Sequence, residues 1–401
     1  ACFKAAARGH LEMIQWALGG NFGWRNVVCK AAAAGGSLRV LQWAHANDCP
    51  WDSTTCSEAA GSGHLDILQW ARSENFPWDS KTCAKAAEGG HLDTLQWARA
   101  HGCPWDGHTC SEAAGGGHLD VLQWARSESC PWDAQTCSKA AEAGHLGILQ
   151  WARAHGCPWD RATCSSAATG GHLEVLQWAR AQGCPWHPQA GAGAVRNGHL
   201  NTLEWMILHG GYLWPRGANH VAARNGHVHI LAMIRASYPV WDSSGVCRAA
   251  AMGGQLGVLQ WARANGCPWY SDTCYEAAKR GEFEVLKWAQ QNGCPWDEHT
   301  CSHAAAAGRL DILQWARERG CPWSGKTCSA AARGGHFEVL KWARGNGCSW
   351  GCDSFWLGGG TCTSAAATGR LDILQWARAR GCPWTYATYK AAGRHKHVKQ
   401  W

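Results

Sequence analysis

The sequence predicts an all-α solenoid, and two observations carry that prediction. A segment close to HLDILQW recurs along the chain, with a step of 27 residues in most places, 28 in two and 34 in one. Copies that repeat at a period of about 20 to 50 residues stack on one another, because no copy can bury its apolar face alone. Each copy also holds two segments of helical character. The copies begin at His10, Ser37, His64, His91, His118, His145, His172, His199, His227, Gln255, Glu282, Arg309, His336 and Arg370.

The first helix of a copy is predicted over residues 80–88. Asp79 is a suitable N-cap, because its carboxylate can accept hydrogen bonds from the free amides of the first helical turn. Cys83 and Ala86 give the helix a narrow apolar face that lets a neighbouring helix approach closely. Gly90 follows the helix, where a left-handed backbone costs least without a Cβ atom.

The second helix of the same copy is predicted to begin at His91. Leu92 and Leu95 follow at helical spacing and mark its buried side. Gly102 stops this helix, and Pro104 prevents its continuation. The predicted unit is therefore a helix, a turn, a second helix and a tight return.

Two tryptophans recur in each copy, such as Trp97 and Trp105. Burial of one indole contributes roughly 4 to 6 kcal/mol before entropy is subtracted. We therefore expect both tryptophans to be core residues. An exposed aromatic ladder that stacks on bases or sugars is the alternative.

Most of the 23 cysteines recur at two fixed places, as Cys103 and Cys110 do. Phe76 stands where other copies have the first of these cysteines, which indicates apolar filling. We therefore predict buried free thiols and a reducing compartment, hence an intracellular protein of the cytoplasm or nucleus. A disulfide between the two cysteines of one copy remains the alternative.

The runs KAAEGGHLDTLQW and SEAAGGGHLDVLQW resemble the AAxxGHLEVVxLL segment of ankyrin repeats. Cys83 and Cys110 fall where the Leu of the family's TPLH motif would be, and that motif is absent. The copies are about six residues shorter than an ankyrin repeat of about 33 residues, and the missing residues correspond to the projecting hairpin. The QWAR and CPWD form is similar to repeats of giant-virus, amoebal and algal or other protist proteins. The resemblance implies an ankyrin-like α-solenoid of paired antiparallel helices with shortened or absent β-hairpins.

The array is expected to be continuous, with regular repeats over 1–186, irregular repeats over 187–246 and regular repeats over 247–401. The irregular part reflects either drift that the stack tolerates or a bend where a partner docks. Because the chain starts and stops within repeats, we expect it to be a piece of a longer protein.

An insertion at 347–362 interrupts the last regular block. Cys348, Cys352 and Cys362, with His336 nearby, could offer four ligands to zinc, but the spacing is a weak metal signal. We expect a surface loop there and predict no metal site.

No phosphate-binding loop, nucleophile elbow or metalloprotease motif is present. The histidine at the first position of many copies recurs too often for an active site, which is needed once, so we expect it to be structural or solvent-facing. The sequence therefore predicts no catalytic residue, no cofactor, no small-molecule substrate and no enzyme. No run approaches the roughly 18 apolar residues of a membrane span, so we expect no membrane partner.

Positions that differ between copies indicate where a partner could bind, because the invariant positions build the stack. We predict a scaffold that binds protein partners of unknown identity on its first helices; the alternative is that these positions vary for lack of constraint. The predicted partner-binding residues are Lys81, Lys85, Glu88, His108, Glu112, Gln135, Lys139, Glu142, Asp272, Glu276, Lys279, Arg280, His299, His303, Lys326 and Arg333.

Nucleic-acid binding is the alternative function. A row of arginines at 27-residue spacing could follow phosphates; its members are Arg72, Arg99, Arg126, Arg153 and Arg180. Acidic residues recur as regularly on the same predicted helices, for example Asp93 and Asp120. The net charge is only +7, and we therefore expect nucleic acid to be an unlikely partner.

Overall fold

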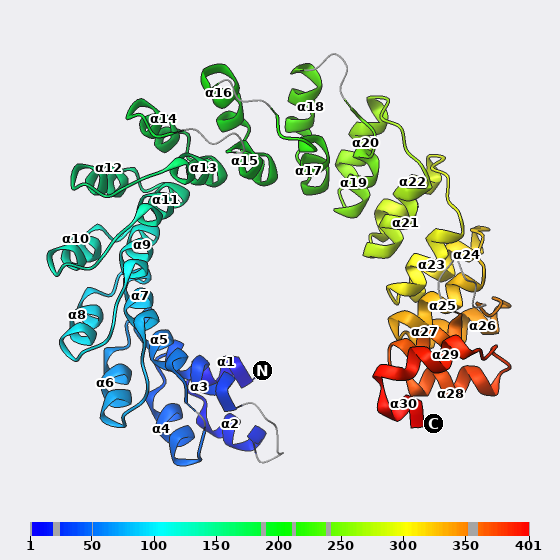
Figure 1. Ribbon diagram of the computed structural model, residues 1–401, viewed down its shortest axis with the longest axis horizontal. Helices are drawn as coiled ribbons and strands as arrows, with labels where there is room; N and C mark the ends of the chain where they lie inside the picture. The colour runs from blue at the N-terminus through cyan, green and yellow to red at the C-terminus, as the bar shows by residue number, and fades with distance from the viewer. Residues whose placement is uncertain are drawn as a thin grey trace. The chain divides into compact units, whose positions relative to one another are not determined.

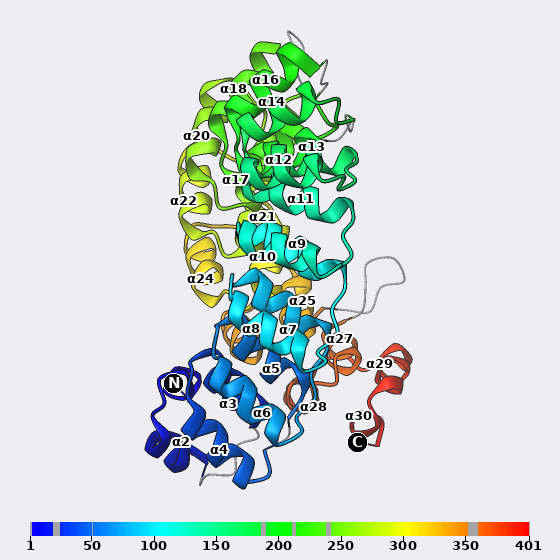
Figure 2. The same ribbon diagram turned by 90° about the vertical axis from the view of Figure 1, so that its left-hand side faces the viewer.

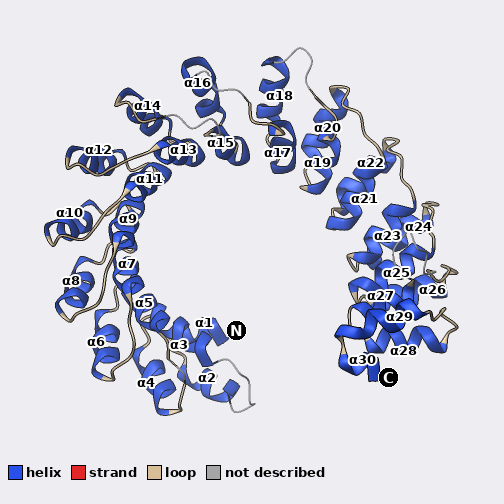
Figure 3. Ribbon diagram, viewed as in Figure 1, coloured by secondary structure: helices blue, strands red, loops and turns tan. Residues whose placement is uncertain are grey.

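The computed structural model describes residues 2–18, 25–49, 51–185, 190–210, 214–237, 242–351 and 360–400. The chain divides into two compact units, Ala1–Pro215 and Arg216–Trp401. Helices, turns and short loops make up the described residues, and none of these residues lies in a strand (Figure 3). The prediction of an all-α solenoid of paired helices without projecting β-hairpins is confirmed for these residues.

In the first unit, odd-numbered helices form one layer and even-numbered helices the other (Figure 1). The odd-numbered helices are α1 (Cys2–Ala7), α3 (Arg25–Ala34), α5 (Ser53–Gly61), α7 (Ser80–Glu88), α9 (Gly107–Gly116), α11 (Ala134–Ala143), α13 (Arg161–Gly170) and α15 (Gly191–Asn197). The even-numbered helices are α2 (Leu11–Leu18), α4 (Leu38–Ala46), α6 (Leu65–Ser73), α8 (Leu92–Ala100), α10 (Leu119–Ser127), α12 (Leu146–Ala154), α14 (Leu173–Ala181) and α16 (Leu200–Gly210). Figure 2 shows α7, α9 and α11 following one another along the stack.

The second unit repeats this alternation. Its odd-numbered helices are α17 (Ala218–Asn225), α19 (Val246–Met252), α21 (Ser271–Arg280), α23 (Glu298–Ala306), α25 (Gly325–Gly334), α27 (Thr361–Ala367) and α29 (Tyr386–Ala391), followed by the 3₁₀ turn η1 (Ala392–Arg394). Its even-numbered helices are α18 (Val228–Ser237), α20 (Leu256–Ala264), α22 (Phe283–Gln291), α24 (Leu310–Glu318), α26 (Phe337–Gly345), α28 (Leu371–Ala379) and α30 (Lys396–Gln400).

Helix α7 shows why each first helix begins and ends where it does. Its N-cap Asp79 accepts a hydrogen bond from the backbone amide of Lys81 at 3.0 Å. At the other end, Gly90 has a φ of +74°, a left-handed conformation that favours glycine. Because both signals are local, the helix has the bounds that the sequence predicts.

The core between the two layers consists of small and aliphatic side chains. Cys83, Ala86 and Ala87 of α7 and Leu95 of α8 are 0% exposed. The small residues allow neighbouring first helices to pack closely.

The tryptophans do not belong to this fully buried core, and the expectation that they would is corrected. Trp97 and Trp105 are half-buried, and no tryptophan of the described part of the chain is among the fully buried side chains. Trp105 instead packs against Trp124 of the next repeat, with 5.7 Å between ring centroids. The indoles therefore cover the joint between repeats rather than fill the centre.

In several copies the first residue joins its repeat to the preceding one by a hydrogen bond. His118 Nε2 donates to the carbonyl of Glu88 at 3.1 Å, and Arg309 Nη1 donates to the carbonyl of Gly281 at 3.0 Å. These carbonyls lie at or just beyond the end of the preceding first helix, where no helical amide is left to bond them. The recurrence of histidine at this position thus has a structural reason, and other polar side chains can replace it.

Gly90 is required for this joint for two reasons. A Cβ on Gly90 would lie 2.4 Å from the imidazole of His118, and its φ of +74° disfavours any side chain. Gly102 has a φ of +83°, but a Cβ on Gly102 would meet nothing within 4 Å. Substitution of Gly102 therefore tests only the cost of the left-handed backbone, whereas substitution of Gly90 also tests the clash with His118.

We predict that Gly90→Ala lowers the free energy of unfolding more than Gly102→Ala does. Gly102→Ala should cost about 1 to 2 kcal/mol through its left-handed backbone, and Gly90→Ala about 1 to 3 kcal/mol more through overpacking. The double variant Gly90→Ala/His118→Ala should recover part of the added cost. Denaturant titration measures all three, and equal costs at the two glycines would show that His118 plays no part.

Candidate binding surfaces

A cleft of about 620 Å³ lies on the first helices of the first unit. Four successive first helices, α5, α7, α9 and α11, supply its walls. The lining residues are Thr54, Ser57, Glu58, Ser80, Lys81, Ala84, Lys85, Glu88, Asp106, His108, Glu112 and Lys139.

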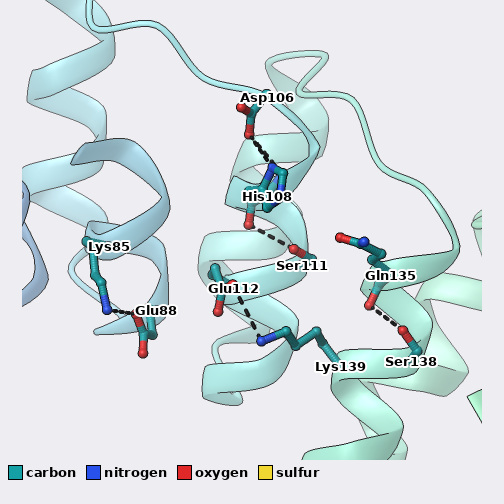
Figure 4. Close-up of polar contacts among 9 residues, drawn as sticks. All are labelled: Lys85, Glu88, Asp106, His108, Ser111, Glu112, Gln135, Ser138 and Lys139. Carbon is teal, nitrogen blue, oxygen red and sulfur yellow. Dashed lines mark hydrogen bonds and ion pairs between the residues drawn. The ribbon is translucent and has the colours of Figure 1, made fainter. Parts of the chain in front are cut away.

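One repeat position forms a row of alternating charge along this cleft. Glu58, Lys85, Glu112 and Lys139 are separated by 27 residues each and come from successive first helices. Lys139 Nζ lies 3.6 Å from Glu112 Oε1, across the joint between α9 and α11 (Figure 4). The cleft therefore presents both signs of charge in a fixed order.

Lys85 and Glu88 form a further ion pair at 2.6 Å within α7, and both side chains stay almost half exposed. The hydrogen bond to Glu88 raises the pKa of Lys85, although burial acts in the opposite direction. Exposed pairs of this kind are worth about 0 to 1 kcal/mol. Both groups remain accessible to a ligand.

The N-cap of α9 faces the same cleft. Asp106 accepts from the backbone amide of His108 at 3.0 Å, and His108 Nδ1 lies 3.2 Å from the same carboxylate oxygen (Figure 4). Burial alone would raise the pKa of Asp106, but hydrogen bonds from Ser80 and His108 outweigh burial and lower it. Asp106 is therefore a fixed negative charge at neutral pH.

The cleft brings together six of the residues singled out from the sequence. These are Lys81, Lys85, Glu88, His108, Glu112 and Lys139. Gln135 and Glu142 lie on α11 but do not line the cleft. Sequence reasoning missed Ser57 and Ala84, whose shared position holds only Ser or Ala in the copies that form the cleft, and Asp106, which serves as a cap. It left out Thr54, Glu58 and Ser80 although their positions vary between copies.

The other singled-out residues lie on α21, α23 and α25 of the second unit. Tyr275, which sequence reasoning also missed, stacks on His303 with ring centroids 4.8 Å apart and lies 6.2 Å from the ring of His299. Serine is the commonest residue at this position in the other copies, and the exceptional tyrosine was the signal that the sequence offered.

The acidic residues of α21 and α23 form ion pairs with cations of neighbouring first helices. Arg248 Nη2 lies 3.2 Å from Glu276 Oε1, and Arg248 Nε lies 4.0 Å from Asp272. Lys326 Nζ lies 2.8 Å from Glu298 Oε1, and this hydrogen bond lowers the pKa of Glu298.

The repeated arginines of the second helices contact their own repeats. The guanidinium carbon of Arg99 lies 4.1 Å from the ring centroid of Trp105, and Arg99 Nη1 donates to the carbonyl of Cys103. The same two kinds of contact recur at Arg72, Arg126 and Arg153. Stacking and a carbonyl hydrogen bond therefore explain why these arginines repeat.

The cysteines with described side chains are buried free thiols. Thiols interact across 20 residues within one helix pair, as Cys83 and Cys103 do. Cys103 and Cys110, seven residues apart, belong to successive helix pairs. The thiol that interacts with Cys103 is therefore Cys83 and not Cys110, the partner that the sequence analysis considered. Burial raises the pKa of Cys247 to about 12, which keeps its thiol uncharged at neutral pH.

No group of three or more potential metal ligands occurs among the described residues. Half of the insertion considered for zinc, residues 352–359 with Cys352, lies outside them. Within the described ranges, no helix combines the length and apolar character needed to cross a bilayer.

Neither the protein-family models nor the curated protein sequences contain a match to this chain. Among solved structures, it is similar to the pentatricopeptide repeat protein PPR10 in complex with an 18-nucleotide psaJ RNA element. That match has 13% identity and a TM-score of 0.37, and covers 100% of this chain and 72% of the other. A structure of the pentatricopeptide repeat protein PPR10 from maize matches with 14% identity and a TM-score of 0.31, over 99% and 72% of the two chains.

The expectation that nucleic acid is an unlikely partner is corrected by these matches. Two of the matched structures, both of PPR10, contain an 18-nucleotide psaJ RNA element. At such low similarity the matches transfer no binding residue to this chain, so its own surfaces must be considered for each class of ligand.

We predict that Arg153→Lys destabilises the protein by about 1 to 2 kcal/mol, because lysine cannot both stack on Trp159 and bond the carbonyl of Cys157. Arg161→Lys, at an exposed position on α13, should change the free energy of unfolding by less than about 0.5 kcal/mol. Denaturant titration of both variants measures the difference. A neutral Arg153→Lys would mean that the arginine row has no structural role.

Proposed function

We propose that the chain is a non-catalytic scaffold that binds an extended protein segment along the cleft of the first unit. The observation that carries this proposal is the row of Glu58, Lys85, Glu112 and Lys139. The four residues occupy one repeat position, line one cleft and alternate in sign, whereas the residues that build the stack stay nearly constant between copies.

The spacing of the row suits a polypeptide. Packed helices lie about 8 to 10 Å apart. An extended chain in the polyproline II conformation advances about 3.1 Å per residue with about three residues per turn, so that every third side chain faces the same side. About three residues of ligand would therefore span each repeat. The complementary segment carries basic, acidic, basic and acidic side chains at intervals of about three residues.

The charges of the cleft disfavour a polyanion at this place. Glu58, Glu88, Asp106 and Glu112 all line it. The first unit as a whole holds 15 Lys and Arg against 18 Asp and Glu. A ligand with both signs of charge meets a partner at each step, whereas a phosphate backbone meets repulsion at every second one.

We also infer that the repeats are shortened relatives of ankyrin repeats. The helix–turn–helix unit and the absence of strands from the described residues support this relationship. The buried free thiols support a reducing intracellular compartment. In this proposal the protein needs no cofactor and has no catalytic residue.

The test is selection of peptides from a random display library against the whole chain. The selected peptides should carry alternating charges, and Lys85→Glu and Lys139→Glu should each weaken them at least about tenfold, which corresponds to about 1.4 kcal/mol. Arg39→Glu, an exposed charge reversal on α4, should leave affinity within about twofold.

A swap of the facing charge in the peptide should restore binding to Lys85→Glu. Peptides that bind all three variants equally would place the binding surface outside the cleft.

A further inference from the structure

The two units differ in charge. Residues 1–215 hold 15 basic and 18 acidic side chains, whereas residues 216–401 hold 22 basic and 12 acidic ones. The net charge of +7 therefore arises entirely from the second unit. A ligand that prefers positive potential is attracted to that unit.

One repeat position that contributes to this difference lies three residues before the first residue of each copy. In the first unit the charged residues at this position are Glu88, Glu142 and Arg196, and in the second they are Arg224, Lys279 and Arg333. The three cations are exposed at the ends of α17, α21 and α25. No ion pair of Lys279 or Arg333 exists among the described residues.

Aromatic rings lie on the same helices as these cations. Tyr275 is one helical turn before Lys279 on α21, and His303 of α23 stacks on it with an interplanar angle of 20°. His299 adds a third ring one turn away from His303. Tyr275 and His303 are half-buried and His299 is exposed, so the rings are partly accessible to a ligand.

The acidic side chains around these rings are paired with cations of the protein, but Asp272 and Glu276 share the single charge of Arg248. Arg248 contacts Asp272 and Glu276, and Lys326 contacts Glu298. The remaining cations of the face are Lys279, Arg280 and Arg333, and they outnumber the one carboxylate charge that Arg248 leaves uncompensated. Among the described residues, this surface therefore combines unpaired cations with stacked rings, which the cleft of the first unit does not.

We propose that this face of α21, α23 and α25 binds single-stranded nucleic acid. Tyr275 and the two histidines stack on unpaired bases, and Lys279, Arg280 and Arg333 contact the phosphates. The cations at Lys279 and Arg333 are two repeats apart, roughly 16 to 20 Å, so one strand contacts both while its bases reach the rings between them.

A single strand fits this chemistry better than a duplex or an acidic peptide. Stacking needs the face of an unpaired base, and every base provides one, so such a site tolerates different sequences. A duplex keeps its bases paired, and an acidic peptide would use the cations but not the rings. The surface lies in the second unit and does not depend on the proposed function of the cleft.

The experiment is a fluorescence anisotropy titration of the whole chain with a labelled single-stranded RNA of mixed sequence, over a range of salt concentrations. The triple variant Lys279→Gln/Arg280→Gln/Arg333→Gln should bind at least about tenfold more weakly. The slope of log affinity against log salt should fall by about 2, since each phosphate contact on a single strand contributes about 0.7. The matched control removes three exposed cations of the first unit, Lys4→Gln/Arg39→Gln/Arg161→Gln, and should leave the affinity within about threefold.

A second pair of variants isolates the stacking. Tyr275→Ser should weaken RNA binding about tenfold with little change in the salt slope, and Tyr275→Phe should retain binding because the ring remains. Circular dichroism and thermal unfolding verify that each variant is folded.

Duplex DNA and polyglutamate, titrated under the same conditions, are the competing ligands. Weaker binding of both than of the single strand supports the proposal. It is overturned if the single strand does not bind at low salt, if the two triple variants lose affinity equally, or if polyglutamate binds as tightly and Tyr275→Ser has no effect. None of these results bears on peptide binding in the cleft, so the two proposals fail separately.

Discussion

The joint between neighbouring repeats is the constraint on which the rest of the structure depends. A polar side chain at the start of one repeat donates to a carbonyl at or just beyond the end of the preceding first helix, as His118 does to Glu88. Helix ends leave such carbonyls without a helical partner, and an unbonded carbonyl in a packed interface is costly. Because the donor side chain lies against the preceding turn, that turn has room only for glycine at positions such as Gly90.

Two further features follow from stacking short repeats. First helices approach closely through alanine and cysteine, so the fully buried core is narrow. The second-helix side is covered by indoles that pack at a steep angle between repeats, as Trp105 and Trp124 do, with Arg99 stacked on Trp105. Trp, Cys, His and Arg thus recur because each makes the same packing contacts in the copies that contain it, and no metal or redox chemistry is needed to account for them.

Function is left to the few positions that the stack does not constrain. On the first unit these positions form a row of alternating charge, from Glu58 to Lys139. On the second unit they bring Tyr275, His303 and unpaired cations onto one face. One repeat can therefore support two surfaces of different chemistry, because substitutions at exposed positions of the first helix leave the joint intact.

The sequence by itself determined the period, the all-α class and the ends of individual helices. Helix α7 has its predicted bounds because an Asp cap and a left-handed glycine act over a few residues. The candidate site could be predicted only as a set of variable positions. The tertiary structure decided which of them share a cleft. It also decided that Cys83 interacts with Cys103 and that tryptophans such as Trp97 and Trp105 remain half-buried. The reason is physical: these relations join residues roughly 20 to 30 positions apart, and only the stacking of helices brings such residues into contact.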